Sequence, residues 1–154
     1  MTLLQLSNRC KLFEEIASEV WTIVKRNHLT NVQPHETGIT NNIVLPFLRS
    51  SVLSNPNIGV WANNAYKEIE HGGDIDVFVE TIPGQYIWWA LQAKVLRLNN
   101  RYEGVRNQNE RGEYQWNRLE RLSINSGCIS RYLLYNGVNN YIHNDFDQCN
   151  RPYD

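Results

Sequence analysis

Two neighbouring segments with different hydrophobic patterns constrain the fold of this chain more than any other feature. Residues 74–80 alternate, with Ile75, Val77 and Val79 on one face, which is typical of a strand that buries one side. Residues 86–96 are almost continuously apolar, which is typical of a buried strand. Between them, the run Ile-Pro-Gly-Gln at 82–85 places Pro and Gly where a type II turn requires them. We therefore predict a β-hairpin.

The chain before this hairpin has a helical pattern. Apolar residues recur at three- and four-residue steps over residues 8–28, with Ser7 available as the N-cap. A second helical pattern runs over residues 35–53, and Pro46 should kink or divide it because proline lacks a backbone N–H.

The rest of the chain supplies further strands and one more helix. The expected elements are a strand over 58–66, a polar loop over 99–112, a helix over 113–125 that ends at Gly127, and a strand over 129–135. A length of 154 residues fits one domain. We expect its core over residues 36–136, an additional N-terminal helix within residues 1–30, and a loose polar tail over 144–154.

Polar residues interrupt both strands of the predicted hairpin. Gln92 and Lys94 are two positions apart in the apolar strand and therefore project from the same face. Burying a lysine there costs several kcal/mol unless a charged partner compensates it. Asp74 and Asp76 share one face of the preceding strand and can supply that partner. The pattern predicts a compact polar site on an apolar sheet.

Metal-dependent phosphodiester hydrolysis is the chemistry that uses all these groups. Mg²⁺ or Mn²⁺ prefers carboxylate, amide and carbonyl oxygens, which Asp74, Gln92 and the backbone of Ala93 offer, with Asp76 as a further candidate ligand. A metal-bound water would be the nucleophile, and Lys94 would orient it and stabilise charge on the phosphate.

These residues resemble the PD-(D/E)xK nuclease superfamily. The resemblance rests on His-Gly-Gly-Asp-Ile-Asp at 71–76, the hairpin, and Leu-Gln-Ala-Lys at 91–94. It is closest to the QxK branch found in Mrr-like restriction enzymes and in small defence proteins. The resemblance implies an α/β fold with a restriction-endonuclease-like core of order α-β-β-β-α-β and a central mixed sheet flanked by helices.

The resemblance also implies roles for particular residues. The superfamily places a metal-binding Glu on the helix before the sheet, and Glu36 is the matching candidate. The implied catalytic set is therefore Glu36, Asp74, Gln92 and Lys94. Because the helix after the third strand often borders the site in this superfamily, Tyr114 and Gln115 are expected to contact substrate.

The distribution of charge bears on the partner. The whole chain has a formal net charge of −1, which excludes a generally basic nucleic-acid-binding surface. Residues 97–131, however, carry seven arginines against four glutamates. Arg97 and Arg101 in this segment can bind a phosphate backbone, or the segment can be a solvated face with salt bridges. The favoured substrate is DNA, with RNA left open.

Other features bear on compartment and assembly. The three cysteines are far apart and form no CxxC pair, so we expect a protein of the reducing cytoplasm rather than a disulfide scaffold. No apolar run is long enough to span a membrane. A homodimer remains open.

Three other hypotheses fit the same residues. The nuclease fold can carry a degraded site and serve only to bind nucleic acid or a partner protein. The Asp–Lys pair can be purely structural, in a scaffold protein. A zinc site formed by His35, His71 and Asp74 is the remaining alternative.

Overall fold

A four-stranded sheet organises the protein, and its strands lie in the order β1-β2-β3-β4. The computed structural model describes residues 3–66 and 68–138, so the tail predicted at 144–154 lies outside the described residues. The strands are β1 (Val60–Asn64), β2 (Ile75–Ile82), β3 (Gln85–Val95) and β4 (Ile129–Tyr135). Strands β1 and β2 pair antiparallel, as do β2 and β3, whereas β3 and β4 pair parallel. The sheet is therefore mixed, and the protein is of the α/β class.

The predicted hairpin is confirmed. Strands β2 and β3 pair antiparallel, with Ile75 opposite Leu91 and Phe78 opposite Trp88. The connecting turn contains Gly84 with a φ of +80°, a conformation that glycine adopts without steric strain and that the third position of a type II turn requires.

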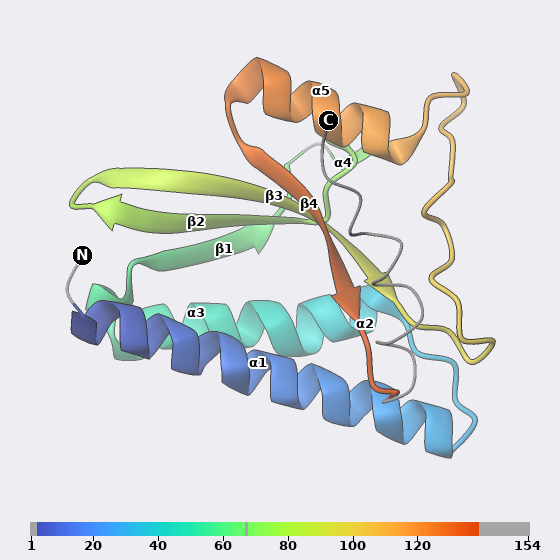
Figure 1. The fold of residues 1–154 in the computed structure, drawn as a ribbon, viewed down its shortest axis with the longest axis horizontal. Helices are drawn as coiled ribbons and strands as arrows, with labels where there is room; N and C mark the ends of the chain where they lie inside the picture. The colour runs from blue at the N-terminus through green and yellow to red at the C-terminus, as the bar shows by residue number, and fades with distance from the viewer. Residues whose placement is uncertain (1–2, 67, 139–154) are drawn as a thin grey trace, which may run out of the picture.

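Helices cover both faces of the sheet, as Figure 1 shows. The helices are α1 (Leu3–Leu29), α2 (Glu36–Ile39), α3 (Leu45–Ser54), α4 (Glu68–His71) and α5 (Gln115–Ser126). Helices α1 and α3 lie side by side on one face, and α5 lies on the other.

Two apolar clusters correspond to these two faces. The larger joins α1 and α3 to alternate sheet residues such as Ile75, Val77 and Ala93. The smaller joins Ala90 to Leu122 of α5 and to Cys128. Since successive residues of a strand point to opposite faces, the alternation in β2 and β3 decides which cluster each side chain enters.

The first helix differs from its prediction at the N-terminal end. It already includes Leu3, so Ser7 lies inside the helix and the prediction that it is the N-cap is wrong. Leucine and glutamine have good helix propensity, and the Leu-Leu-Gln-Leu run before Ser7 continues the helix at little cost.

The predicted helix over 35–53 is divided, as Pro46 suggested. Helix α2 runs into a π-helical turn, Thr40–Val44, and α3 follows with proline near its start. Because Pro46 has no backbone N–H, it cannot donate to the carbonyl four residues earlier. The hydrogen bonds of the π-helical turn span five residues, and this widening compensates for the lost hydrogen bond.

Within residues 3–66 and 68–138, no helix is long and apolar enough to cross a bilayer.

Candidate functional site

A polar cavity of about 520 Å³ lies where the hairpin meets α2 and the start of α5. It brings together five of the residues predicted from the sequence: Glu36, Asp74, Gln92, Lys94 and Gln115. These residues come from four separate segments of the chain, so the cavity exists only in the folded protein.

Asp74 lies immediately before β2 and faces β3. Its backbone N–H donates to the carbonyl oxygen of Leu91 at 2.8 Å, which fixes the residue opposite the centre of the predicted site. The Oδ2 atom accepts hydrogen bonds from the backbone N–H of Ala93 at 2.8 Å and from the side-chain amide of Gln92. The carboxylate is thereby held over residues 92 and 93.

Gln92 is 2% exposed, and both ends of its carboxamide are engaged. Its Nε2 donates to Asp74 Oδ2 and, at 3.1 Å, to the carbonyl oxygen of Ala93. Its Oε1 accepts a hydrogen bond from Nε2 of Gln115. A buried amide this fully bonded has a defined orientation.

Lys94 is buried and forms an ion pair with Glu36. Lys94 Nζ lies 3.6 Å from Glu36 Oε2, and the two side chains are 6% and 22% exposed. Glu36 Oε1 also accepts from the backbone N–H of Val95 at 3.4 Å and lies 4.0 Å from Nη2 of Arg97. Glu36 is the first residue of α2, where the helix dipole also favours a negative charge.

Asp76 lies in a neighbouring cavity and not in this one. That smaller cavity, about 150 Å³, is lined in part by His71, Trp88 and Leu122. The indole Nε1 of Trp88 donates to Asp76 Oδ1 at 2.8 Å. Two residues along an extended strand are about 7 Å apart, so Asp74 and Asp76 share a face but belong to different polar contacts.

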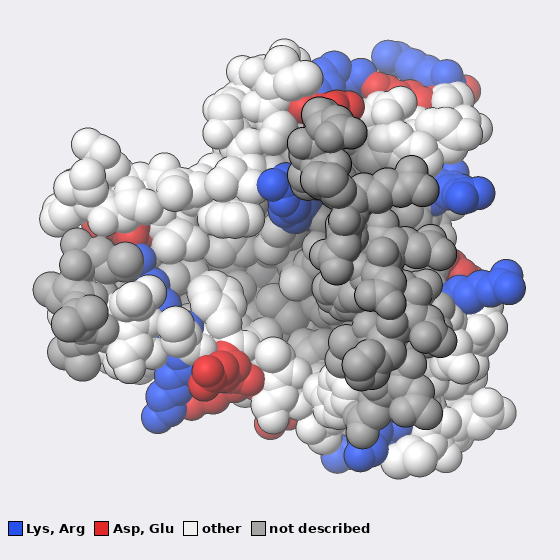
Figure 2. All heavy atoms as spheres, viewed as in Figure 1, with Lys and Arg blue, Asp and Glu red and all other residues white. Residues whose placement is uncertain are grey.

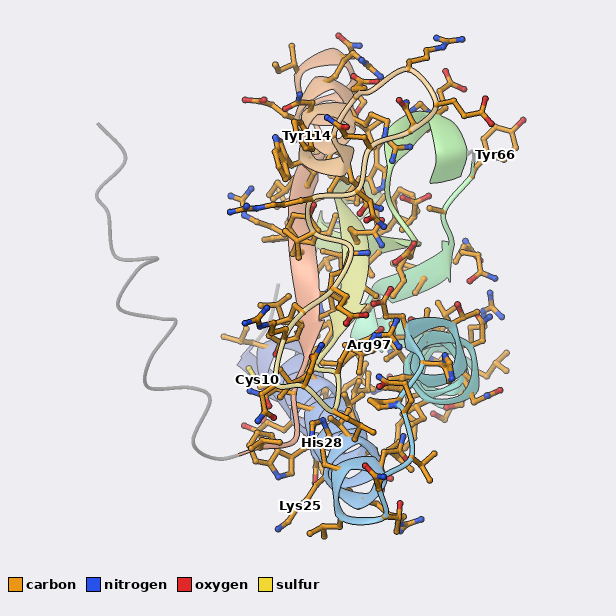
Figure 3. All side chains as sticks on the ribbon, turned by 90° about the vertical axis from the view of Figure 1, so that its right-hand side faces the viewer. Cys10, Lys25, His28, Tyr66, Arg97 and Tyr114 are labelled. Carbon is orange, nitrogen blue, oxygen red and sulfur yellow. The ribbon has the colours of Figure 1, made fainter. Side chains whose placement is uncertain are left out.

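The other predicted substrate residues lie outside the cavity lining. Tyr114 stacks on Trp116 with ring centroids 4.3 Å apart, and Arg101 is exposed. Arg97 bonds to the carbonyl oxygen of Pro34 at 2.7 Å and lies 3.7 Å from Glu103. Figure 3 shows Tyr114 beside α5 and Arg97 well below it, so these two side chains do not converge on one point.

Sequence reasoning missed several residues of the cavity. Its lining also includes Thr40, Asn41, Asn64 and Asn107. Thr40 follows Glu36 by four residues, which places both on one helix face, and this spacing was the signal available. The asparagines had none, because asparagine is abundant throughout this chain.

Thr40 connects the cavity to a buried tyrosine on β4. Thr40 Oγ1 and the Tyr135 hydroxyl lie 2.9 Å apart. Burial raises the pKa of Tyr135 to about 12, the hydrogen bond to Thr40 opposes this, and the charges of Asp74 and Glu36 add to it. The phenol is therefore neutral at physiological pH and can donate a hydrogen bond.

The oxygen atoms around Gln92 fit a hard divalent cation. Asp74 Oδ2 and the Ala93 carbonyl oxygen both receive hydrogen bonds from one nitrogen, Gln92 Nε2, so the two oxygens lie near each other beside this amide. Glu36 adds a second carboxylate to the same cavity. Carboxylate and carbonyl oxygens with water are the ligands that Mg²⁺ and Mn²⁺ prefer.

Among the residues that the structure describes, no three acidic, histidine or cysteine side chains lie close enough together to hold a metal ion. The alternative of a zinc site from His35, His71 and Asp74 is therefore wrong. A cation at Asp74 would depend on the oxygens of Gln92 and Ala93 as well.

Surface charge gives no single basic patch on the face that Figure 2 shows. There the visible lysines and arginines are scattered, most of them near the outline of the molecule, and several lie beside acidic residues. Arg121 and Glu113, for example, form an ion pair. Part of the excess arginine charge in residues 97–131 is thus balanced by ion pairs within the protein.

The fold and this cavity define an α/β protein with a buried polar site at the end of a β-hairpin. Residues 9–153 match the model of a protein family of unknown function, DUF6615. Because this match covers nearly the whole chain, the protein belongs to that family. No curated protein matches the chain.

Proposed function

We propose that the protein is a metal-dependent nuclease with a restriction-endonuclease-like fold of the PD-(D/E)xK type, with DNA as its favoured substrate. One observation supports this more than any other. Asp74, Gln92 and Lys94 of the hairpin share a cavity with Glu36 of the helix before the sheet. This is the set of residues that the resemblance to the superfamily implies.

The order of elements also supports the proposal. From α2 and α3 onward, leaving aside single-turn segments, the chain reads helix, three strands, α5 and β4. This matches the α-β-β-β-α-β core of the superfamily. The parallel pairing of β4 with β3 follows from the crossover through α5, because a parallel neighbour needs such a connection.

The proposed metal ligands are Asp74, the Ala93 carbonyl and the Gln92 amide oxygen, with Glu36 beside them. When bound, Mg²⁺ or Mn²⁺ supplies a Lewis acid that makes the phosphate more electrophilic and water more acidic. Asp76 is left out of the proposed set because it lies in the neighbouring cavity with Trp88.

Lys94 is the proposed catalytic cation of the protein itself. Its ammonium is shielded from bulk water, so its attraction for a phosphate oxygen is screened less than at the surface. Hydrolysis adds the oxygen of one water to phosphorus and breaks the bond to one ester oxygen, which leaves after taking a proton. Lys94 stabilises the charge that develops on the phosphate oxygens during this exchange.

One feature favours a second candidate, a nuclease fold that only binds nucleic acid or a partner. Glu36 is engaged by Lys94, by Arg97 and by the N–H of Val95. A carboxylate held in this way is also what a purely structural ion pair requires.

A cleavage assay with matched variants tests the proposal. Plasmid DNA and single-stranded RNA are incubated with the protein and Mg²⁺ or Mn²⁺, with EDTA as the blank. Asp74→Ala should abolish both cleavage and Mn²⁺ binding measured by calorimetry. Lys94→Met should lower the cleavage rate by about 10²- to 10³-fold, as for a lost transition-state donor, and keep most of the Mn²⁺ affinity.

Asp76→Asn is the control, because it removes a neighbouring acid outside the cavity. It should leave both measurements largely unchanged. Absence of cleavage with retained nucleic-acid binding would support the second candidate. Loss of Mn²⁺ binding in the Asp76 variant equal to that in the Asp74 variant would contradict the proposed ligand set.

A further inference from the structure

Gln115 and Gln92 form a buried pair of carboxamides beside the proposed metal position. Gln115 is the first residue of α5 and is 8% exposed. Its Nε2 donates to Oε1 of Gln92 and, at 3.3 Å, to the carbonyl oxygen of Gly72. Gln92 in turn donates to Asp74 and Ala93. A chain of hydrogen bonds therefore runs from Gly72 through both amides to Asp74.

One atom of this pair is left over. Within the part of the chain that the structure describes, Gln115 Oε1 is buried and has no hydrogen-bond partner. A buried acceptor without a donor costs about 1–3 kcal/mol, and most such groups in proteins have a specific explanation.

The orientation of Gln92 suggests that explanation. With Nε2 directed at Asp74 Oδ2 and the Ala93 carbonyl, the N–H groups of Gln92 face the two oxygens that a cation would need. A cation bound by these oxygens would be repelled by the amide N–H groups and needs the oxygen of Gln92 on this side instead. Rotation of the carboxamide by 180° exchanges its oxygen and nitrogen with little other movement, because the two ends have nearly the same size.

That rotation has a consequence for Gln115. It brings Gln92 Nε2 against Gln115 Nε2, and two N–H donors then face each other. If Gln115 rotates as well, its Oε1 accepts from Gln92 Nε2 and gains the partner it now lacks. The hydrogen bond from Gln115 to the Gly72 carbonyl is lost in exchange, which favours the present orientation in the absence of metal.

We infer that Gln115 is a positioning residue whose carboxamide rotates together with that of Gln92 when a divalent cation binds, and so sets the affinity of the site for metal. This inference rests on the proposed metal site. Gln115 acts through Gln92 and is not itself a ligand, so its role differs from the substrate contact expected from the sequence.

Gln115→Glu tests the inference, because a carboxylate accepts hydrogen bonds and donates none. It cannot hold Gln92 in its present orientation and can only accept from the rotated Nε2. Mn²⁺ binding measured by calorimetry should tighten by about tenfold, the equivalent of roughly one hydrogen bond.

The same substitution in the Gln92→Glu background separates orientation from charge. A carboxylate at position 92 has no N–H to direct, so Gln115→Glu should no longer tighten Mn²⁺ binding there. Asn117→Asp, on an exposed position of α5, controls for an added charge and should change the affinity little. Equal tightening in both backgrounds would overturn the inference, because charge alone would then explain it.

A measurement on the wild-type chain covers the case in which the buried glutamate prevents folding. The side-chain amide protons of Gln115 should exchange faster with water when Mg²⁺ is added, since their bond to Gly72 is lost, and NMR follows this directly. Unchanged exchange with Mg²⁺ bound would overturn the inference and leave the nuclease proposal standing. A wild-type protein that neither binds Mn²⁺ nor cleaves DNA overturns both.

Discussion

The ion pair between Lys94 and Glu36 should respond very unequally to the loss of its two members. Lys94→Met removes the cation and keeps the length of the side chain, and Glu36→Gln removes the negative charge and keeps the shape. The two side chains are 3.6 Å apart, but Lys94 is 6% exposed and Glu36 is 22% exposed. The more deeply buried Lys94 therefore depends more on the charge of its partner than Glu36 does.

The magnitude follows from this geometry. Two unit charges at this separation attract each other by roughly 5 kcal/mol at an effective dielectric constant of about 20. Dehydration of the buried ammonium offsets most of this gain. Lys94→Met removes both terms, and Glu36 retains Arg97 at 4.0 Å, so we expect a net loss of about 0–1 kcal/mol of stability.

Glu36→Gln leaves the dehydration of Lys94 in place without its compensating charge. We expect a loss of about 2–4 kcal/mol, as for a buried ion whose partner is removed. The double variant should be more stable than Glu36→Gln alone, because it no longer buries an uncompensated cation.

Urea unfolding followed by tryptophan fluorescence, in EDTA at pH 7, measures these differences. The exposed pair of Lys11 and Glu15, 4.0 Å apart, is the matched control. Lys11→Met and Glu15→Gln should each change stability by no more than about 0.5 kcal/mol. A larger loss for Lys94→Met than for Glu36→Gln would refute the reasoning from burial.

Two further predictions concern pH and backbone conformation. Tyr135 has a pKa raised to about 12 by burial, so the folded state holds its proton more tightly than the unfolded state, and stability should fall by roughly 2–3 kcal/mol as pH rises from about 10 to 12; Tyr135→Phe should reduce this fall in pH-dependent urea melts. Gly59 has a φ of +62°, and an added Cβ would lie 2.5 Å from Arg9 Nη2 and 2.9 Å from Glu80 Oε2, so Gly59→Ala should lower stability by about 1–3 kcal/mol in the same assay.

A specific result would contradict each of these two predictions. An alkaline loss of stability that is identical in the wild type and Tyr135→Phe would show that this phenol does not contribute. Gly84 also has a positive φ, +80°, but no atom lies within 4 Å of an added Cβ. Gly84→Ala is therefore the control for Gly59→Ala, and an equal loss in both would assign the effect to backbone strain alone.

Local sequence determined most of the secondary structure. The alternation after Asp74, the Pro-Gly turn and the apolar strand predicted the hairpin because each depends on residues close together in the chain. Gly127 likewise marked the end of α5, where it has a φ of +71°. Ser7 was misassigned because the start of a helix depends on small differences in propensity between neighbouring residues.

Only the tertiary structure decided which polar groups meet. Asp74 and Asp76 occupy equivalent positions in the alternating sequence pattern. The strand register sets Asp76 opposite Ala90, and the two aspartates therefore line different cavities. Gln115 is far from Gln92 in sequence, and their contact depends on how α5 packs across the sheet. A repeating pattern specifies the face on which a side chain lies, but the contact it makes there is set by the register and packing of distant segments, and these are decided only when the whole core forms.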